Sequence, residues 1–445
     1  MHSRFRISLQ ERYKYMKNLC CRTAGVILAS ASILLVSGCA GQPQSTGNDV
    51  TITFLNPHVG GYDAVIAAFE AANPTIQVEQ QSVPFDQMIS QTQARLGSKD
   101  SSIDVVSVDP PRLPDMVEKG FLMDVSSRAA EMDKKFTESG IKSVTWEGKQ
   151  WAYPLWTSDN FLFYNKDVLT AAGIALPGAT DADRMTWEQV LAAVQKVKES
   201  GAAEYGFTIE QVDRYYSLQP LLTSMGAGSG LTGDGNLVPE VNSSKWNEFG
   251  TWYQNLYDSG LSPKGVDPAQ MIDLFKTGQS AFLLGGPTRI ADLQASDLAD
   301  KWGMAPHPYF EGKEIVTPTD SWAIGVSAYS ENQDAARKFA EFATLDTDGS
   351  VAASSKLNLP PVNTEAFPKY VNFLKSVAPN QVIELPALFD IDTAQYAVHR
   401  PSSVGYVEFE TTMNKAFADI RNGGDVTSIL DKAQDVLERQ LARRK

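Results

Sequence analysis

The chain has 445 residues, which is enough for two or three domains, and 43% of them are hydrophobic, which is enough for folded cores. Its 53 acidic residues outnumber the 39 basic ones, and the formal net charge is −14. Such an acidic chain lacks the basic surface that holds phosphate backbones, which argues against nucleic acid as a partner. Aromatic residues make up 10% of the chain, so rings are available to line a ligand site.

The first 38 residues have the pattern of an export signal. Lys17 and Arg22 precede an apolar stretch at 24–36, and small residues follow it. The apolar stretch has about 13 residues, fewer than the roughly 20 that a transmembrane helix needs. Met16 is an alternative to Met1 as the first residue, because Met16 and Lys17 together would begin a conventional signal.

Val36-Ser37-Gly38-Cys39 resembles the bacterial lipobox, a motif whose cysteine is acylated and becomes the new N-terminus. The resemblance implies two acyl chains on Cys39, which is what stable anchoring requires. We therefore expect a lipoprotein signal peptide at 1–38, lipidation at Cys39, a flexible tether at 39–50, and a location at the outer face of the cell membrane. The chain from Cys39 onward has 33 basic and 52 acidic residues, a formal charge of −19.

The cysteines all lie in the first 39 residues. Cys20, Cys21 and Cys39 are the only three, so the rest of the chain can form neither an internal disulfide nor a cysteine metal site. We expect no metal and no cofactor.

Residues 51–108 alternate short β-rich runs with amphipathic helical stretches. The β-rich runs are 51–55, 75–79 and 103–108. The helical stretches are 62–73 and 85–96. This βαβαβ order predicts an α/β fold with a parallel, doubly wound sheet whose ligands bind beyond the carboxyl ends of the strands. Asn56, His58 and the segment Asp109–Arg112 follow such strands.

The rest of the chain predicts a second, more helical lobe. Helical patterns lie at 186–197, 245–257, 333–344 and 426–441. A strand is predicted at 322–326 and an extended segment at 359–362.

Several short motifs occur in a specific order. The most specific is WEGKQWAYP at 146–154, followed by FYNKDVL at 163–169, AGI at 172–174 and TWE at 186–188. Others are FKTGQSAF at 275–282 before Gly285, WAI at 322–324, AARKF at 335–339, and Arg400-Pro401 with Gly405-Tyr406. Together they resemble the extracellular solute-binding proteins of family 1, the substrate receptors of bacterial ABC importers for sugars and related solutes. The resemblance covers nearly the whole chain after the leader.

This resemblance implies a two-lobed fold like that of periplasmic binding proteins, in which each lobe is a doubly wound sheet flanked by helices. Lobe 1 is expected at 51–157, completed by 320–362, and lobe 2 at 158–319, completed by 363–445. Crossings between lobes are expected near 154–160, 317–322 and 360–363. The ligand binds in the cleft, closure creates the surface that the permease recognises, and ligand contacts from both lobes drive closing. No catalysis is expected, and the protein is expected to be a monomer.

Sugar hydroxyls favour polar side chains, and the apolar faces of sugars stack on rings. On that basis the candidate ligand residues are Asn56, His58, Asp109, Arg112, Trp156, Asp159, Asn160, Arg289, Asp320, Trp322, Arg400 and Tyr406. Other roles remain open for some of them. Trp156 and Trp322 could pack in the core, Asp109 could cap a helix, and His58 could be an ordinary loop residue.

Thr288 and Arg289 stand where such proteins often bring an aromatic ring onto the sugar, which weakens a simple malto-oligosaccharide assignment. Arg289 and Arg400, with His58, could instead bind a polyol phosphate or another anionic solute. A secreted glycosidase, using a pair of carboxylates, is the remaining alternative.

The segment GSGLTG at 228–233 matches a dinucleotide-binding pattern, but a helical stretch rather than a strand precedes it. The sequence contains no zinc-protease, phosphate-loop or serine-hydrolase motif.

Overall fold

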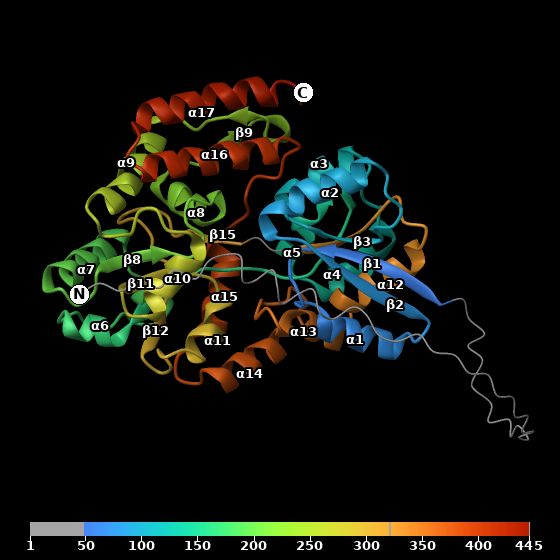
Figure 1. The fold of residues 1–445 in the computed structure, drawn as a ribbon, viewed down its shortest axis with the longest axis horizontal. Helices are drawn as coiled ribbons and strands as arrows, with labels where there is room; N and C mark the ends of the chain where they lie inside the picture. The colour runs from blue at the N-terminus through green and yellow to red at the C-terminus, as the bar shows by residue number, and fades with distance from the viewer. Residues whose placement is uncertain (1–48, 320–321, 445) are drawn as a thin grey trace, which may run out of the picture. The chain divides into compact units, whose positions relative to one another are not determined.

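The structure is a computed structural model that describes residues 49–319 and 322–444 (Figure 1). The predicted signal peptide, Cys39 and nearly all of the predicted tether lie outside these ranges, and so does the candidate ligand residue Asp320. Among the described helices, none is long and apolar enough to cross a membrane.

The first sheet has five strands in the order β2-β1-β3-β14-β6. Their bounds are β1 Val50–Asn56, β2 Ile76–Ser82, β3 Val105–Val108, β6 Tyr153–Pro154 and β14 Ala323–Val326. Strand β1 pairs in parallel with both β2 and β3, which confirms the βαβαβ prediction. We call the part of the fold around this sheet lobe 1.

The five-stranded sheet is mixed beyond the predicted parallel unit, because β14 is antiparallel to both β3 and β6. Neighbouring strands become parallel when a helical crossover joins them, as α1 and α2 do within 50–108. Strand β14 instead arrives after a long excursion of the chain through the second lobe, so no such crossover sets its direction.

Helices α1 (Asp63–Ala72), α2 (Met88–Gly97), α12 (Gln333–Thr344) and α13 (Thr347–Ser355) pack around this sheet. Residues of α1 recur at helical spacing on its buried face, and Asn73-Pro74 follows the end of the helix. Phe54 of β1 and Phe69 of α1 both meet Phe339 of α12, with ring centroids 5.6 and 5.3 Å apart. All residues of this core fall within 52–156 and 323–362, so two separate stretches of chain build lobe 1.

The second sheet has four strands in the order β12-β7-β11-β8. Their bounds are β7 Phe161–Asn165, β8 Tyr205–Ile209, β11 Ser280–Gly285 and β12 Trp302–Ala305. Strands β8 and β11 are parallel, but β7 is antiparallel to β11 and β12, so this sheet is mixed as well. We call the surrounding part lobe 2; its buried core residues fall within 161–310 and 370–441.

The long helices of lobe 2 include three that the sequence predicts: α7 (Trp187–Ser200), α9 (Ser244–Asp258) and α17 (Val426–Leu441). Thr186 begins α7 with a capping box in which Gln189 takes part, which satisfies backbone amides at the helix start. Helix α16 (Tyr406–Arg421) packs against α17 and α9 (Figure 1).

The remaining α-helices and β-strands complete the described part of the fold. They are α3 Leu113–Glu118, α4 Ala129–Lys135, α5 Glu138–Ser143, β4 Thr145–Trp146, β5 Lys149–Gln150, α6 Lys166–Ala171, α8 Tyr215–Met225, β9 Leu231–Thr232, β10 Val238–Pro239, α10 Pro268–Lys276, α11 Arg289–Gln294, β13 Thr317–Pro318, α14 Phe367–Val377, α15 Leu385–Ile391 and β15 Ala397–Val398. The segment 228–233 follows α8 and includes β9, so it lacks the strand-to-helix setting of a dinucleotide site. A Cβ on Gly230 would approach the Trp246 ring to 2.7 Å, which gives this glycine a packing role.

Three segments that pass between the lobes lie side by side. Thr157 donates a backbone hydrogen bond to Pro360 (2.8 Å), and Leu155 donates one to Trp322 (3.0 Å). Strand β13 pairs in parallel with β15. These contacts join the segments at the points where the chain passes from one sheet to the other.

Candidate functional site

A cavity of about 650 Å³ lies between the lobes. Its volume is within the roughly 300–1,000 Å³ that is typical of small-ligand sites. The sequence-predicted residues that line it are His58, Asp109, Arg112, Trp156, Asp159, Asn160, Arg289, Trp322 and Arg400. Asn56 and Tyr406 do not line it; both are fully buried.

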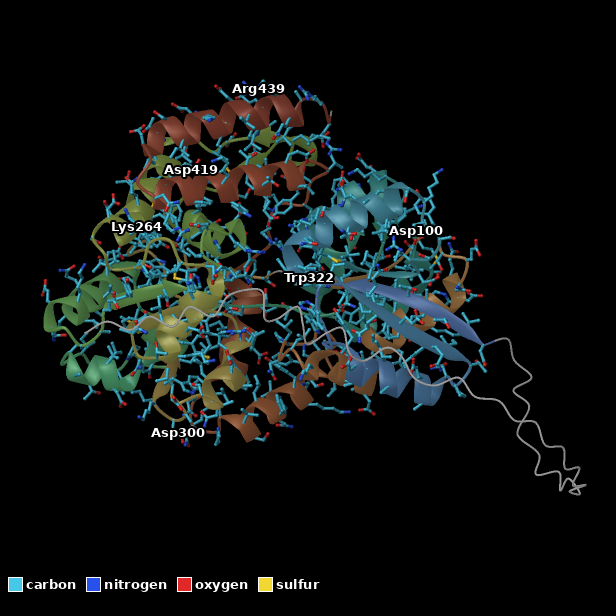
Figure 2. All side chains as sticks on the ribbon, viewed as in Figure 1. Asp100, Lys264, Asp300, Trp322, Asp419 and Arg439 are labelled. Carbon is cyan, nitrogen blue, oxygen red and sulfur yellow. The ribbon has the colours of Figure 1, made fainter. Side chains whose placement is uncertain are left out.

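Aromatic side chains form one wall of the cavity. The Trp156 ring is 0% exposed and stacks on Tyr62 at 5.7 Å between centroids, so it also serves as core packing. Trp322, which Figure 2 labels, is half-buried and meets Phe85 edge-on at 5.6 Å. Phe85 is 40% exposed. Trp322 and Phe85 therefore offer ring surface that a ligand can reach.

His58 stands beside this wall, with its ring 5.6 Å from that of Trp156. Burial lowers the pKa of His58 to about 4, so the imidazole is neutral at pH 7. Asn56 sits behind it, and its side-chain oxygen accepts the backbone N–H of His58 at 2.9 Å. The side chain of Asn56 therefore stabilises the turn after β1.

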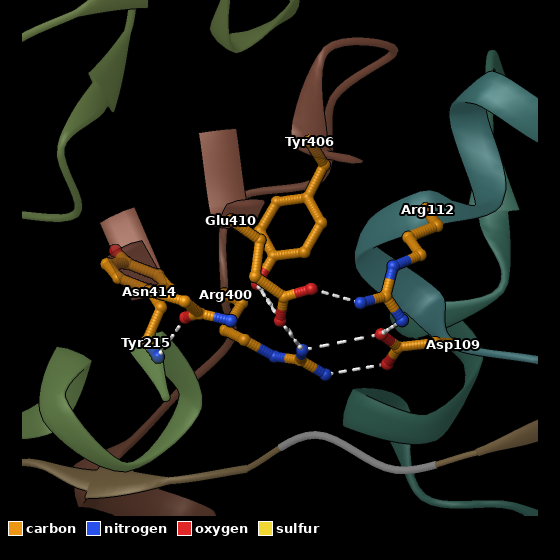
Figure 3. A network of polar contacts seen from close by, with 7 residues as sticks. All are labelled: Asp109, Arg112, Tyr215, Arg400, Tyr406, Glu410 and Asn414. Carbon is orange, nitrogen blue, oxygen red and sulfur yellow. Dashed lines mark hydrogen bonds and ion pairs between the residues drawn. The ribbon is translucent and has the colours of Figure 1, made fainter. Parts of the chain in front are cut away.

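Asp109 and Arg112 of lobe 1 meet Arg400 and Glu410 in one network of ion pairs (Figure 3). Arg400 is 2.6 Å from Asp109 and 3.3 Å from Glu410. Arg112 pairs with both of these carboxylates. Glu410 lies on α16 of lobe 2, so the network links the two lobes.

Tyr406 supports this network from α16, because its hydroxyl donates to Glu410 at 3.3 Å. Burial raises the pKa of Asp109, but the attraction of Arg400 and Arg112 outweighs burial and holds that pKa below its usual value. Asp109 makes no side-chain hydrogen bond that caps the following helical turn, so the capping role is not observed.

Asp159 and Asn160 line the cavity at the point where the chain enters lobe 2. The carboxylate of Asp159 accepts the backbone N–H of Asn160 at 2.7 Å. Burial and the neighbouring Asp392 carboxylate raise the pKa of Asp159 well above its usual value. Asp392 is itself paired with Arg184 at 2.6 Å. Asp159 therefore takes up a proton more readily than an exposed aspartate does.

Arg289 begins α11 on the lobe 2 side of the cavity. Its guanidinium is 2.9 Å from Asp292 and 3.4 Å from Glu210. Carboxylates of the same lobe therefore neutralise Arg289.

The cavity also contains side chains that the sequence did not indicate. They include Phe85, Glu210, Arg214, Tyr216 and Glu410. Glu210 and Arg214 follow β8, so the rule that ligands bind beyond strand ends, applied to lobe 2, would have found them. Glu410 gives no such signal, because it lies within a helix more than 290 residues from Arg112 along the chain.

A two-lobed α/β fold with a cavity between the lobes is typical of one class of ligand-binding protein. Comparisons with known proteins agree with this class. The model of the bacterial extracellular solute-binding protein family matches residues 56–349, and the chain belongs to this family.

No group of three or more histidine, cysteine or acidic residues that could hold a metal occurs in the described part of the chain.

Among curated proteins, the chain is 22% identical to the galactooligosaccharide-binding protein of Bacillus subtilis (strain 168), over 94% of this chain and 95% of that one. It is 24% identical to the maltodextrin-binding protein of the same organism, over 77% and 81% of the two chains. Among solved structures, an ABC substrate-binding protein from Listeria monocytogenes in complex with cycloalternan has a TM-score of 0.76. It is 21% identical, and the match covers 88% of this chain and 99% of that one.

Proposed function

We propose that this protein captures a carbohydrate in the cavity between its lobes and delivers it, unchanged, to the permease of a bacterial ABC importer. The cavity carries the proposal. It combines accessible ring surface on Trp322 and Phe85 with hydrogen-bonding groups on His58, Asp159 and Asn160. Rings that stack on apolar sugar faces and a few placed polar groups are the combination a saccharide requires. The relatives named for sugar ligands support the same class of solute.

Delivery requires that the loaded form differ from the empty one. We propose hinge segments at 154–160, 317–322 and 360–363, with lobe 1 at 51–157 and 320–362 and lobe 2 at 158–319 and 363–445. A ligand that contacts both lobes only in the closed form shifts the population toward that form. The protein acts as a monomer in this proposal.

The thermal midpoint of the purified protein tests the class of ligand. A ligand at 100 times its dissociation constant adds about 2.7 kcal/mol to stability and raises the midpoint. A panel of neutral sugars, acidic sugars, polyols and polyol phosphates should give a shift with saccharides. A shift with polyol phosphates alone would contradict the proposal, and so would recovery of a hydrolysed saccharide, which would indicate a glycosidase.

We further propose that Cys39 carries the lipid that holds the protein at the outer face of the membrane. The lipobox-like VSGC and the preceding apolar stretch support this proposal. Cys39→Ser should release the protein from the membrane fraction in the native host. Retention of the variant in that fraction would contradict lipid anchoring.

A further inference from the structure

Arg214 lies on the lobe 2 wall of the cavity, at the turn between β8 and α8. It is half-buried, and its guanidinium carbon is 4.5 Å from the centroid of the Phe85 ring. Phe85 belongs to lobe 1 and packs against Trp322 at 5.6 Å. The guanidinium therefore borders the accessible aromatic surface that we propose for the sugar.

Arg214 differs from the other arginines that line the cavity. Arg112 and Arg400 share Asp109 and Glu410, and Arg289 has Asp292 and Glu210. No ion pair between described residues includes Arg214. Its guanidinium is thus a cation that the described part of the chain leaves without a carboxylate.

The nearest carboxylate along the chain is already used. Asp213 accepts the hydroxyl of Tyr253 at 2.8 Å and pairs with Arg421 at 2.8 Å. Its backbone φ of 62° is in the left-handed region, so the side chains of Asp213 and Arg214 leave the turn in different directions. Asp213 is therefore committed to the core of lobe 2.

The surroundings of Arg214 favour an added negative charge. Burial lowers the pKa of Arg214; Glu410 and Asp109 oppose this effect, while Arg112 and Arg400 reinforce it. A desolvated cation near two others is stabilised when an anion binds it through paired, charge-assisted hydrogen bonds. One face of the guanidinium is occupied by Phe85, and its edges remain for such bonds.

We propose that Arg214 selects an acidic saccharide, by binding the carboxylate of a hexuronic acid unit whose ring packs on the Trp322 and Phe85 surface. This inference rests on the proposed carbohydrate function and adds the class of sugar to it. A single guanidinium matches the single charge of a carboxylate. A phosphate monoester carries about −1.5 to −2 charges at pH 7, and the Asp109 and Glu410 carboxylates nearby would repel the excess.

Titration calorimetry on the full-length protein tests the inference with matched ligands. The probes are galacturonic and glucuronic acid and their di- and trisaccharides, the corresponding neutral galactose and glucose series, and glucose 6-phosphate. We expect the acidic member of a pair to bind about 10- to 100-fold more tightly than the neutral one, the range for a hydrogen-bonded charge. Its affinity should fall as salt is raised.

Arg214→Gln should remove this preference by lowering the affinity for the acidic member far more than that for the neutral one, and Arg214→Lys should retain part of it. Arg439→Gln is the control, because Arg439 is exposed on α17 (Figure 2) and its loss changes the net charge equally. A thermal midpoint of Arg214→Gln at or above that of the wild type would show that the variant folds.

Each other outcome overturns the inference. Preferential binding of neutral saccharides would remove the acidic class and leave the proposed carbohydrate function standing. Equal losses for acidic and neutral ligands in Arg214→Gln would show that Arg214 does not select the carboxylate. Binding of glucose 6-phosphate alone would overturn this inference, because the anion would then be a phosphate, and binding of no saccharide would remove both this inference and the proposed function.

Discussion

At the scale of the residue, the two tryptophans that line the cavity have different roles. Trp156 supports the wall from the core, and Trp322 offers ring surface to a ligand. Trp156 is fully buried against Tyr62, whereas Trp322 is half-buried and faces the exposed ring of Phe85. The sequence places both tryptophans at crossings between lobes but cannot separate these roles, because burial depends on neighbours brought from 62 and 85. The same holds for Asn56, which the structure places behind His58.

Trp322→Ala should weaken saccharide binding by about 1 to 3 kcal/mol, because a stacked ring is lost, with little change in the free energy of unfolding. Trp156→Ala should instead destabilise the fold by about 3 to 5 kcal/mol, since it leaves a cavity in the core. Calorimetric titration and urea unfolding separate the two effects. Unchanged affinity in Trp322→Ala would contradict the role of this ring.

The pH dependence of stability tests the burial of His58. The pKa of His58 falls from its usual value of 6.5 to about 4 on folding, so the unfolded chain takes up a proton that the folded protein excludes between these values. The free energy of unfolding should therefore decrease as the pH falls from 6.5 to 4. His58→Gln should lose less stability over that range in urea unfolding; an identical loss in both proteins would contradict the lowered pKa.

At the scale of the element, periodicity predicts which residues form a helix better than it predicts how strands are arranged. The bounds predicted for α12 and α17 agree with the structure. The directions of β7 and β14 could not be predicted, because side-chain alternation reports the buried face of a strand but not its partner. The contact between Glu410 of α16 and Arg112, which follows β3, also escaped prediction, because helical periodicity does not indicate the partner of a helix either.

That contact should be stabilising through the network in Figure 3. Glu410→Gln removes a charge that pairs with both Arg112 and Arg400, and should lower the free energy of unfolding by about 1.5 to 3 kcal/mol. Asp419→Asn is the control on the same helix, because it breaks only the exposed pair with Lys415 and should cost about 0.5 kcal/mol or less. Equal losses in urea unfolding would contradict an energetic role for the network.

At the scale of the whole molecule, each lobe is completed by a distant stretch of chain, and the cavity draws its lining from both lobes. The family resemblance in the sequence indicates this plan, and nine of the predicted site residues reach the cavity. Residues such as Arg214 and Glu410 were missed because the motifs that carry the resemblance do not include them.

We expect the two lobes to close around the ligand. A ligand that contacts both lobes should reduce the radius of gyration measured by small-angle X-ray scattering, because it favours the closed population. Trp322→Ala, measured at the same ligand concentration, should show a smaller reduction. An unchanged radius at saturating ligand would contradict closure around the cavity.

We propose that the cavity between the lobes holds one carbohydrate. Calorimetric titration of the purified protein with a saccharide series, repeated in Trp322→Ala, measures this binding. We expect saturable binding at one ligand per chain, and weaker binding in the variant. Absence of saccharide binding, or binding that the variant leaves unchanged, would contradict it.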